Sequence, residues 1–210
     1  MKPDRQVLLL LNGELALPRL VRRLAARASA VVCTDGGCRH AARLGVTPTV
    51  IVGDMDSLPK RLPRWKGTAY LCDFDEDCSD LEKAFRLVLR MGADWVWVAG
   101  ALGGRLDHTL VNLALFEKQA AAGLRLALVH DGLALLAGEG DIRLACRSSE
   151  TLSLLASGDG CVVSTRGLRY RLKSRALAPG SLGLSNRAVS KDVRIRVHRG
   201  RLWVIRPDVI

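Results

Sequence analysis

Two carboxylates end an apolar run near residue 50, where the chain reads TVIVGDMDS. Asp54 and Asp56 are two positions apart, so both can point the same way beyond the run. Acidic residues that converge repel one another unless a cation lies between them, and Mg²⁺ prefers hard oxygen ligands from carboxylates, water and phosphates. The pair predicts a magnesium-phosphate site, although a lone Asp-x-Asp can equally cap a strand and start a helix.

A second acidic segment strengthens the prediction of a metal site. It spans residues 73–80 and contains Asp73, Asp75, Glu76, Asp77 and Asp80. Two acidic segments that end neighbouring strands would concentrate negative charge at one place, which a divalent cation bound to a polyphosphate would balance.

A glycine-rich segment, GALGGRLDH, occupies residues 100–108. Glycines between a strand and a helix let backbone N–H groups approach a phosphate, and the helix N-terminus adds the positive end of its dipole. Arg105 can bind phosphoryl oxygens in a bidentate manner, and Asp107 can complete a metal site or orient a nucleophile. His108 can contact a phosphate or simply pack within the helix. The segment contains neither the dinucleotide fingerprint G-x-G-x-x-G nor a P-loop.

Alternating apolar runs and helical patterns must position these segments. Because ligands of open α/β sheets bind beyond the carboxyl ends of the strands, the acidic and glycine-rich segments should meet on one rim. The alternation favours a mostly parallel sheet with helices on both faces. Strands are predicted at 7–11, 30–33, 49–52, 69–71 and 95–99, and helices at 18–28, 38–44, 79–91 and 106–122.

The pattern changes after Gly123 to short apolar runs separated by Gly, Asp and Ser, which is typical of an antiparallel sandwich. The sequence therefore predicts an α/β protein, with a mostly parallel α/β sheet domain at 1–123 followed by an antiparallel β-sandwich domain at 124–210. Strands are predicted in the second domain at 125–129, 133–137, 142–145, 151–155, 161–164, 168–172, 193–197 and 202–205.

The net charge of +11 raises the question of a nucleic-acid partner. Twelve basic residues lie between 166 and 206, with Asp192 as the one acid. In 169–173 and 193–197, however, basic and other residues alternate with a period of two, as on the solvent face of a half-buried strand. We therefore favour a solvated sheet face and consider nucleic acid an unlikely partner.

The composition also bears on the compartment. No apolar run approaches the roughly 20 residues that a membrane span needs, and the six cysteines include no C-x-x-C pair. Neither a zinc site nor a thioredoxin-type motif is therefore indicated. We expect reduced thiols and a cytoplasmic protein without a membrane anchor.

Taken in order, five short motifs resemble those of the thiamine pyrophosphokinase family. They are NGE at 12–14, TDGG at 34–37, GDMDS at 53–57, DCSD at 77–80 and GGRLDH at 103–108. The resemblance continues in STxGLxYxL at 164–172 and GxSN at 183–186, and so covers nearly the whole chain. It implies an α/β catalytic domain, a β-sandwich domain and a homodimer with active sites between the subunits.

The resemblance also implies a reaction, in which ATP and thiamine give AMP and thiamine diphosphate with the help of Mg²⁺. By position, it makes Asp54, Asp56 and Asp80 the metal-binding catalytic acids, supported by Asp77 and Asp107. Thiamine would contact Ser185 and Asn186, and Trp203 is either a stacking platform for its ring or a core tryptophan of the last strand. Contacts to the nucleotide or its phosphates are assigned to Asp35, Gly36, Gly37, Ser79, Gly103, Gly104, Arg105 and His108.

Two positions depart from the family's pattern. Glu76 stands where the family usually has Lys or Gln, and Ser79 stands where it has Thr. A negative charge in place of a hydrogen-bond donor could change which alcohol the enzyme accepts as its substrate. A pyrophosphokinase for another hydroxyalkyl heterocycle is therefore an alternative. A nucleic-acid-binding module built on the basic second domain is a further one. The sequence does not decide whether Asp80 or Asp107 accepts the hydroxyl proton.

Overall fold

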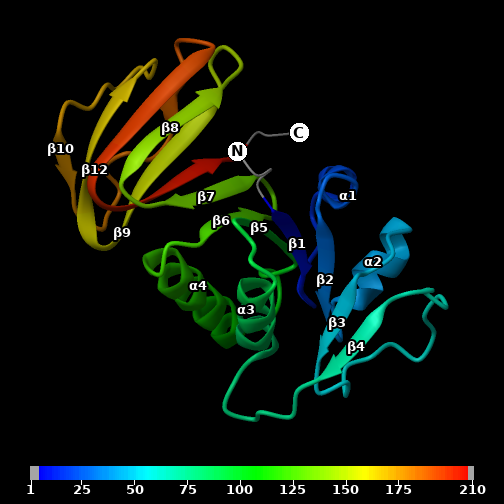
Figure 1. Cartoon of the computed structure of the whole chain (residues 1–210). Helices are drawn as coiled ribbons and strands as arrows, with labels where there is room; N and C mark the ends of the chain where they lie inside the picture. The colour runs from blue at the N-terminus through cyan, green and yellow to red at the C-terminus, as the bar shows by residue number, and fades with distance from the viewer. Residues whose placement is uncertain (1–4, 208–210) are drawn as a thin grey trace. The chain divides into compact units, whose positions relative to one another are not determined.

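The computed structural model describes residues 5–207, which form two compact units (Figure 1). Within this range, the first unit comprises 5–119 and 124–130, and the second comprises 120–123 and 131–207. No helix among the described residues is long and apolar enough to cross a membrane.

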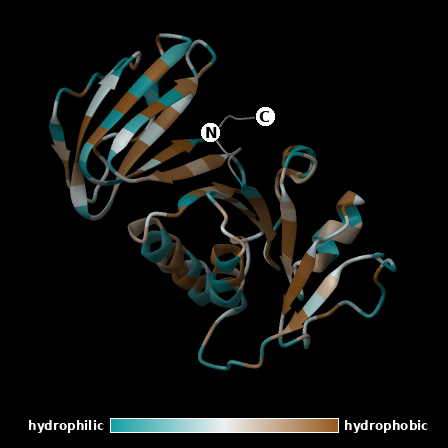
Figure 2. Ribbon diagram, viewed as in Figure 1, coloured by the Kyte–Doolittle hydropathy of each residue, from teal (hydrophilic) through white to brown (hydrophobic). Residues whose placement is uncertain are grey.

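A parallel sheet forms the centre of the first unit, with its strands in the order β6-β5-β1-β2-β3-β4. Its central strands are buried on both faces, as expected for a sheet covered by helices, and Figure 2 shows them as mostly hydrophobic. The strands are β1 (Gln6–Leu10), β2 (Ala30–Thr34), β3 (Val50–Gly53), β4 (Ala69–Cys72), β5 (Trp95–Ala99) and β6 (Arg125–Val129).

Helices cover both faces of this sheet (Figure 1). On one side lie α1 (Pro18–Ala25) and α2 (Cys38–Leu44), and on the other lie α3 (Asp80–Arg90) and α4 (Leu106–Ala121). The Ser79 hydroxyl accepts a hydrogen bond from the Glu82 amide at 3.3 Å and so caps α3, as its spacing predicts. The buried rings of Phe85 and Phe116 join α3 to α4 edge to face, with centroids 5.9 Å apart.

The strand order reverses between β1 and β5. From β1 the chain adds β2, β3 and β4 on one side, whereas β5 and β6 lie on the other. A crevice beyond the carboxyl ends of the strands at such a reversal is the usual ligand site of open α/β sheets. The turn at 11–14 follows β1 and the glycine-rich turn at 100–105 follows β5, so both lie at the reversal.

Two long, bent strands, β9 and β12, organise the second unit. They pair antiparallel, with register shifts between 197 and 201. Successive halves of β12 also pair with β8 and then β7, and successive halves of β9 with β11 and then β10. The result is two layers that share both long strands. The strands are β7 (Leu133–Ala137), β8 (Gly140–Ala145), β9 (Thr151–Arg166), β10 (Arg175–Leu177), β11 (Asn186–Arg187) and β12 (Asp192–Arg206).

One apolar cluster fills the interior of the second unit. It includes Leu152 and Val163 from the two halves of β9, and Ile195 and Leu202 from the two halves of β12. Along the first half of β12 the buried residues alternate with exposed arginines, and Figure 2 shows this alternation. The predicted solvated sheet face is thus confirmed at residues 193–197.

Six of the predicted strands differ in detail from the structure. Residues 125–129 were grouped with the antiparallel strands, but β6 pairs in parallel with β5 because α4 acts as a crossover helix between them. Strand β6 therefore belongs to the first unit, and the strands of the second unit begin with β7. The paired runs at 151–155 and 161–164, and at 193–197 and 202–205, each form one strand, because irregularities bend these strands without ending them. Residues 168–172 form a loop with one bridge, between Leu168 and Ala188.

Candidate active site

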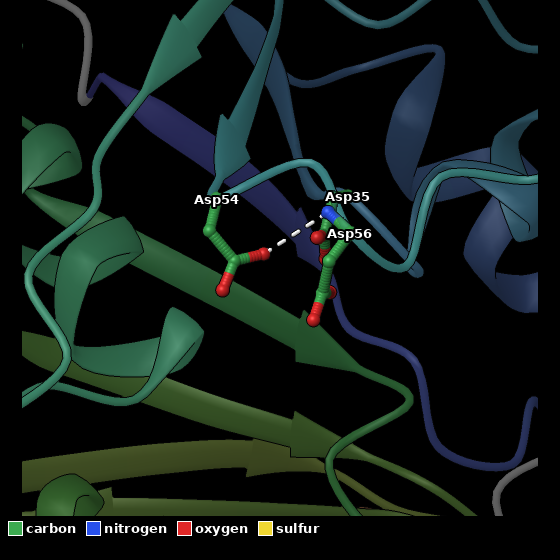
Figure 3. A group of neighbouring side chains, drawn as sticks. All are labelled: Asp35, Asp54 and Asp56. Atoms are coloured by element: carbon green, nitrogen blue, oxygen red, sulfur yellow. Dashed lines mark hydrogen bonds between the residues drawn. The ribbon is translucent and has the colours of Figure 1, made fainter.

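The carboxylates of Asp35, Asp54 and Asp56 lie together beyond the ends of β2 and β3 (Figure 3). One oxygen atom from each side chain lies within 4.8 Å of the others. Asp54 directly follows β3, and its Oδ1 accepts a hydrogen bond from the Asp56 amide at 3.1 Å. Because β2 and β3 are parallel neighbours, their carboxyl ends bring the two segments to the same edge of the sheet.

Asp35 is the buried member of this group, with 1 % of its surface exposed. Its Oδ1 accepts a hydrogen bond from the Gly36 amide at 2.6 Å, and its Oδ2 accepts one from the Ser57 amide at 3.3 Å. The side chain therefore fixes the turn after β3 as well as its own. The sequence assigned Asp35 to the nucleotide, whereas its position is beside the candidate metal ligands.

Gly36 and Gly37 are also buried, against the end of β1. A Cβ at Gly37 would lie 2.1 Å from the Leu10 carbonyl oxygen, and one at Gly36 would lie 2.4 Å from the Asn12 side chain. Close packing thus accounts for both glycines. Their predicted contact with the nucleotide stays a prediction.

Asp80 opens α3 and joins the acidic group electrostatically. Burial and the Asp35 carboxylate raise the pKa of Asp80 to about 6; Lys83 opposes this shift and Asp54 adds to it. A hydrogen bond from the Asp56 amide, by contrast, lowers the pKa of Asp54. Ionised Asp80 is thus disfavoured by burial and by the neighbouring carboxylates of Asp35 and Asp54, and a bound divalent cation would relieve this cost.

The glycine-rich turn is hydrogen-bonded to the turn after β1. The amides of Leu11, Gly13 and Glu14 donate to the carbonyl oxygens of Ala99, Gly100 and Leu102 at 2.9, 2.7 and 2.7 Å. Gly100 has φ +75°, and a Cβ there would lie 2.3 Å from the Leu11 carbonyl oxygen, so only glycine fits. The two turns at the reversal of the sheet therefore form one fixed support.

Arg105 and Asp107 form an ion pair at the start of α4, in which Nη2 lies 2.5 Å from Oδ2. The hydrogen bonds from Arg105 lower the pKa of Asp107 to about 2. Asp107 Oδ1 also accepts the His108 amide at 2.9 Å. The side chains of Arg105 and Asp107 are 75 % and 58 % exposed, so the pair can open toward a ligand.

A cleft of about 550 Å³ connects the acidic segments with the glycine-rich turn. Asp56, Asp77, Gly103 and Asp107 lie on the same segments but outside its lining. Asp77 is exposed, and its amide donates to Asp75 Oδ1 at 3.1 Å. The sequence-predicted residues that line the cleft are Asp54, Ser79, Asp80, Gly104, Arg105 and His108, and Glu76 lies with them.

Two basic residues of α3, Lys83 and Arg86, lie at the site although no motif pointed to them. Arg86 donates to the Asp75 carboxylate at 2.9 Å and contacts the Cys78 sulfur, so it holds the acidic segment against the helix. Lys83 lines the cleft and is almost wholly buried. The spacing of Lys83 from Asp80 could have indicated this position, because a residue three positions after Asp80 lies on the same side of a helix.

The predicted thiamine-binding residues all belong to the second unit. Ser185 is exposed, with φ +52°, and its amide donates to Ser153 Oγ at 3.0 Å. The buried Asn186 side chain binds the Tyr170 amide at 3.0 Å and the Tyr170 carbonyl at 2.8 Å, so it shapes the loop. Trp203 is half-buried between the core residues Leu202 and Val204, and alternation along β12 places it on the face opposite that core.

Both units match known family models. The model described as thiamin pyrophosphokinase, catalytic domain, matches residues 21–128, and the one described as thiamin pyrophosphokinase, vitamin B1 binding domain, matches residues 141–202. The predicted order of an α/β domain followed by a β domain is thereby confirmed.

Individual relatives agree with the family models. The chain is 26 % identical to thiamine pyrophosphokinase 1 of Oryza sativa subsp. japonica, over 90 % of this chain and 83 % of that protein. It is 25 % identical to thiamine pyrophosphokinase of Bacillus subtilis, over 77 % and 79 % of the two chains.

Solved structures show the same fold. The crystal structure of thiamine pyrophosphokinase from Bacillus subtilis has a TM-score of 0.82 at 19 % identity, and covers 98 % of this chain and 100 % of that chain. Thiamin pyrophosphokinase from Candida albicans has a TM-score of 0.78 at 16 % identity, and the coverage is 98 % and 90 %. The matches favour neither a nucleic-acid-binding module nor a transferase for another heterocycle. Since the two family models together span most of both units, the chain belongs to the thiamine pyrophosphokinase family.

Proposed function

We propose that this protein transfers a diphosphate group from ATP to the hydroxyl group of thiamine, giving thiamine diphosphate and AMP. One observation carries the proposal. The carboxylates of Asp54, after β3, and Asp80, at the start of α3, face a glycine-rich turn across one cleft at the reversal of a parallel sheet, and Asp35 and Asp56 lie beside Asp54. This arrangement combines ligands for a cation with backbone donors for phosphates. The family membership supports thiamine as the acceptor.

The acidic group fits a divalent cation, which we propose to be Mg²⁺. The cation would be held by Asp54, Asp56 and Asp80, and the buried Asp35 beside them would support these ligands. The support for this assignment is the convergence of the Asp35, Asp54 and Asp56 oxygens within 4.8 Å and the raised pKa of Asp80. When bound, the cation offsets negative charge on the phosphates and so favours attack on phosphorus.

The remaining residues orient the reactants. The turn at 100–105 and the first turn of α4 would bind phosphate oxygens through backbone amides, and Arg105 would exchange Asp107 for a phosphoryl oxygen. The thiamine hydroxyl then attacks the β-phosphorus in line, the bond to the α-phosphate oxygen breaks, and AMP leaves with the electron pair. Such a transfer depends mainly on positioning and charge.

The hydroxyl proton needs an acceptor, for which Asp80 and Asp107 are the two candidates. Asp80 lines the cleft, and its pKa is raised to about 6. Asp107 lies outside the lining, and its pKa is lowered to about 2 by Arg105. We assign proton acceptance to Asp80, because it lines the cleft whereas the Asp107 carboxylate is paired with Arg105 outside the lining.

Thiamine recognition falls to the second unit in this proposal. Ser185 offers an exposed hydroxyl group, whereas Asn186 acts by holding the loop around Tyr170, because its amide group is already hydrogen-bonded. Trp203, on the face of β12 opposite the core, would stack on the thiamine ring.

We also propose that the active form is a cytoplasmic homodimer. Leu106, Leu110 and Val111 on α4 are 73, 59 and 48 % exposed, and association would remove such apolar surface from water. The six cysteines are free thiols, as a reducing compartment keeps them. Light scattering after size-exclusion chromatography tests the assembly, and a monomeric mass at micromolar concentration would contradict the dimer.

The function is tested by incubating the protein with ATP, Mg²⁺ and thiamine. AMP and thiamine diphosphate should appear in equal amounts, and Asp54→Asn should produce neither at a comparable rate. Release of AMP with a pterin or pyrimidine alcohol, but not with thiamine, would overturn the assignment of the acceptor.

A further inference from the structure

Lys83 is the one lysine or arginine among residues 5–207 that the structure buries, with 4 % of its surface exposed. It lies on α3, which packs on β2 and β3, the strands that carry Asp35 and Asp54 at their ends. The residue also lines the cleft. A lysine is seldom buried without a charged partner, because removing an ammonium group from water is costly.

The ammonium group of Lys83 is not satisfied by the protein. Its Nζ lies 3.8 Å from Asp80 Oδ1, which is too far for a hydrogen bond. No hydrogen bond joins Nζ to any residue in the described range. An ammonium group has three N–H donors, and Nζ is not among the described buried atoms that lack a hydrogen-bond partner, so its donors open on the cleft. A ligand in the cleft that carries acceptors can therefore reach them.

The neighbouring acids would not accept hydrogen bonds from Lys83 Nζ once a cation and a nucleotide are bound in the cleft. Asp54 and Asp80 are the carboxylates whose pKa values Lys83 lowers, so both lie within its electrostatic reach. In the proposed function these carboxylates hold a cation, and their charge is then directed to it. Phosphate oxygens on the same cation would lie beside the acids, and hence near Nζ.

We propose that Lys83 is a catalytic residue that binds a phosphate oxygen of the nucleotide, beside the acids that hold the cation. The identity of the ligand, a nucleoside triphosphate, rests on the proposed function. Lys83 differs from Arg105 in that it is fixed by burial, whereas Arg105 is exposed and paired with Asp107. A buried, preorganised cation gives stronger charge stabilisation than an exposed one.

Three variants separate charge from shape. Lys83→Met keeps the length of the side chain and removes its charge, and Lys83→Arg keeps the charge. Lys118→Met is the matched control, because Lys118 lies in the same unit but is 64 % exposed and paired with Glu82 at 2.8 Å. Circular dichroism confirms that each variant is folded, and Lys83→Gln replaces Lys83→Met if the latter does not fold.

The first measurement is the affinity for α,β-methylene-ATP with Mg²⁺, by calorimetry without thiamine. Loss of a charge-assisted hydrogen bond should weaken binding by Lys83→Met about 10- to 100-fold. Lys83→Arg should keep most of the affinity, and Lys118→Met should bind like the parent. Parental affinity in folded Lys83→Met would overturn the inference.

The second measurement excludes a role through Asp80 alone. Mn²⁺ binding without nucleotide, followed by electron paramagnetic resonance, should be preserved or tightened in Lys83→Met, because a repelling cation is removed. Weakened Mn²⁺ binding together with parental nucleotide affinity would show that Lys83 only positions Asp80. A parent that binds the analogue but releases no AMP with thiamine would refute the proposed function and leave the inference about Lys83 intact.

Discussion

The amide of Gly13 donates a hydrogen bond to the carbonyl oxygen of Gly100 at 2.7 Å, and so joins the turn after β1 to the turn after β5. The two strands lie side by side at the reversal of the sheet. The backbone that we propose to bind phosphates is therefore held by main-chain hydrogen bonds, and the Arg39, His40 and Asn112 side chains add hydrogen bonds to carbonyl oxygens of the two turns. It should be sensitive to atoms added where the two turns touch.

Gly100→Ala should destabilise the first unit. Its φ of +75° is unfavourable for alanine, and the new Cβ would lie 2.3 Å from the Leu11 carbonyl oxygen. We expect the free energy of unfolding to fall by about 1–3 kcal/mol, measured by urea denaturation. Gly104→Ala is the control in the same turn, because no atom lies within 4 Å of its Cβ position. Equal stability of the two variants would contradict the packing argument.

Asp54→Asn and Asp56→Asn should each lower turnover by orders of magnitude and leave the fold intact, because each removes a carboxylate from the cation site. The rate of AMP release is measured over a range of Mg²⁺ concentrations. Glu82→Gln on α3 is the matched loss of one charge, and its kinetics should stay close to the parent's because Glu82 pairs with Lys118. Parental kinetics for Asp54→Asn at saturating Mg²⁺ would refute the metal assignment.

The metal-free protein should lose stability as the pH rises from about 4 to about 6. The pKa of Asp80 is about 6 in the folded state and near 3.8 in the unfolded chain, so in this window the folded state keeps a proton that the unfolded chain has released. Folding is thus favoured at low pH, and this contribution is lost as the pH passes 6. Melting temperatures of the parent and Asp80→Asn, measured with EDTA, test the effect. If the difference in melting temperature between the parent and Asp80→Asn were the same throughout this pH range, the prediction would be contradicted.

The second unit contains a buried ion pair that should govern its stability. Glu150 Oε1 accepts a hydrogen bond from Arg206 Nε at 2.7 Å, and Oε2 accepts one from the Arg147 amide at 2.8 Å. Arg206→Met would leave the buried carboxylate without its partner and should cost about 3–5 kcal/mol by urea denaturation. Exposed Arg196→Met, which breaks the pair with Asp141, should cost far less.

The same ion pair predicts a loss of stability in acid. Burial alone would raise the pKa of Glu150, but the hydrogen bonds from Arg206 and the Arg147 amide outweigh it and lower that pKa. Ionised Glu150 therefore stabilises the folded state at pH values above the ordinary carboxyl pKa. This stabilisation is lost as the pH falls through the lowered pKa of Glu150 in the folded state. The stability difference between the parent and Glu150→Gln should narrow in acid. A difference that is independent of pH would refute this.

Local patterns were enough to predict the elements around the cleft. The apolar runs of β1, β2, β3 and β5 and the cap at Ser79 are short-range signals, and parallel pairing then brings the strand ends to one rim. The convergence of Asp35 with Asp54 and Asp56 depends on the pairing of β2 with β3, which is a long-range contact. The sequence accordingly named the three residues but gave Asp35 a different partner.

Other features could not be predicted because tertiary contacts decide them. Whether Lys83 faces water or the cleft depends on how α3 packs on the sheet, which is a tertiary contact. Strand β6 looks like any short apolar run, and its parallel pairing with β5 follows from the path of the chain after α4. Asn186 was expected to meet the substrate, but its amide is hydrogen-bonded to the backbone of Tyr170.

Strands β9 and β12 each pass through both layers of the second unit. A slip of one residue between them would turn inward-facing side chains outward in both layers at once. A change of register in one layer would therefore disturb the pairing in the other. The amides of the second unit should exchange with solvent as a single cooperative group, so a ligand held by residues of one layer would also slow the opening of the other.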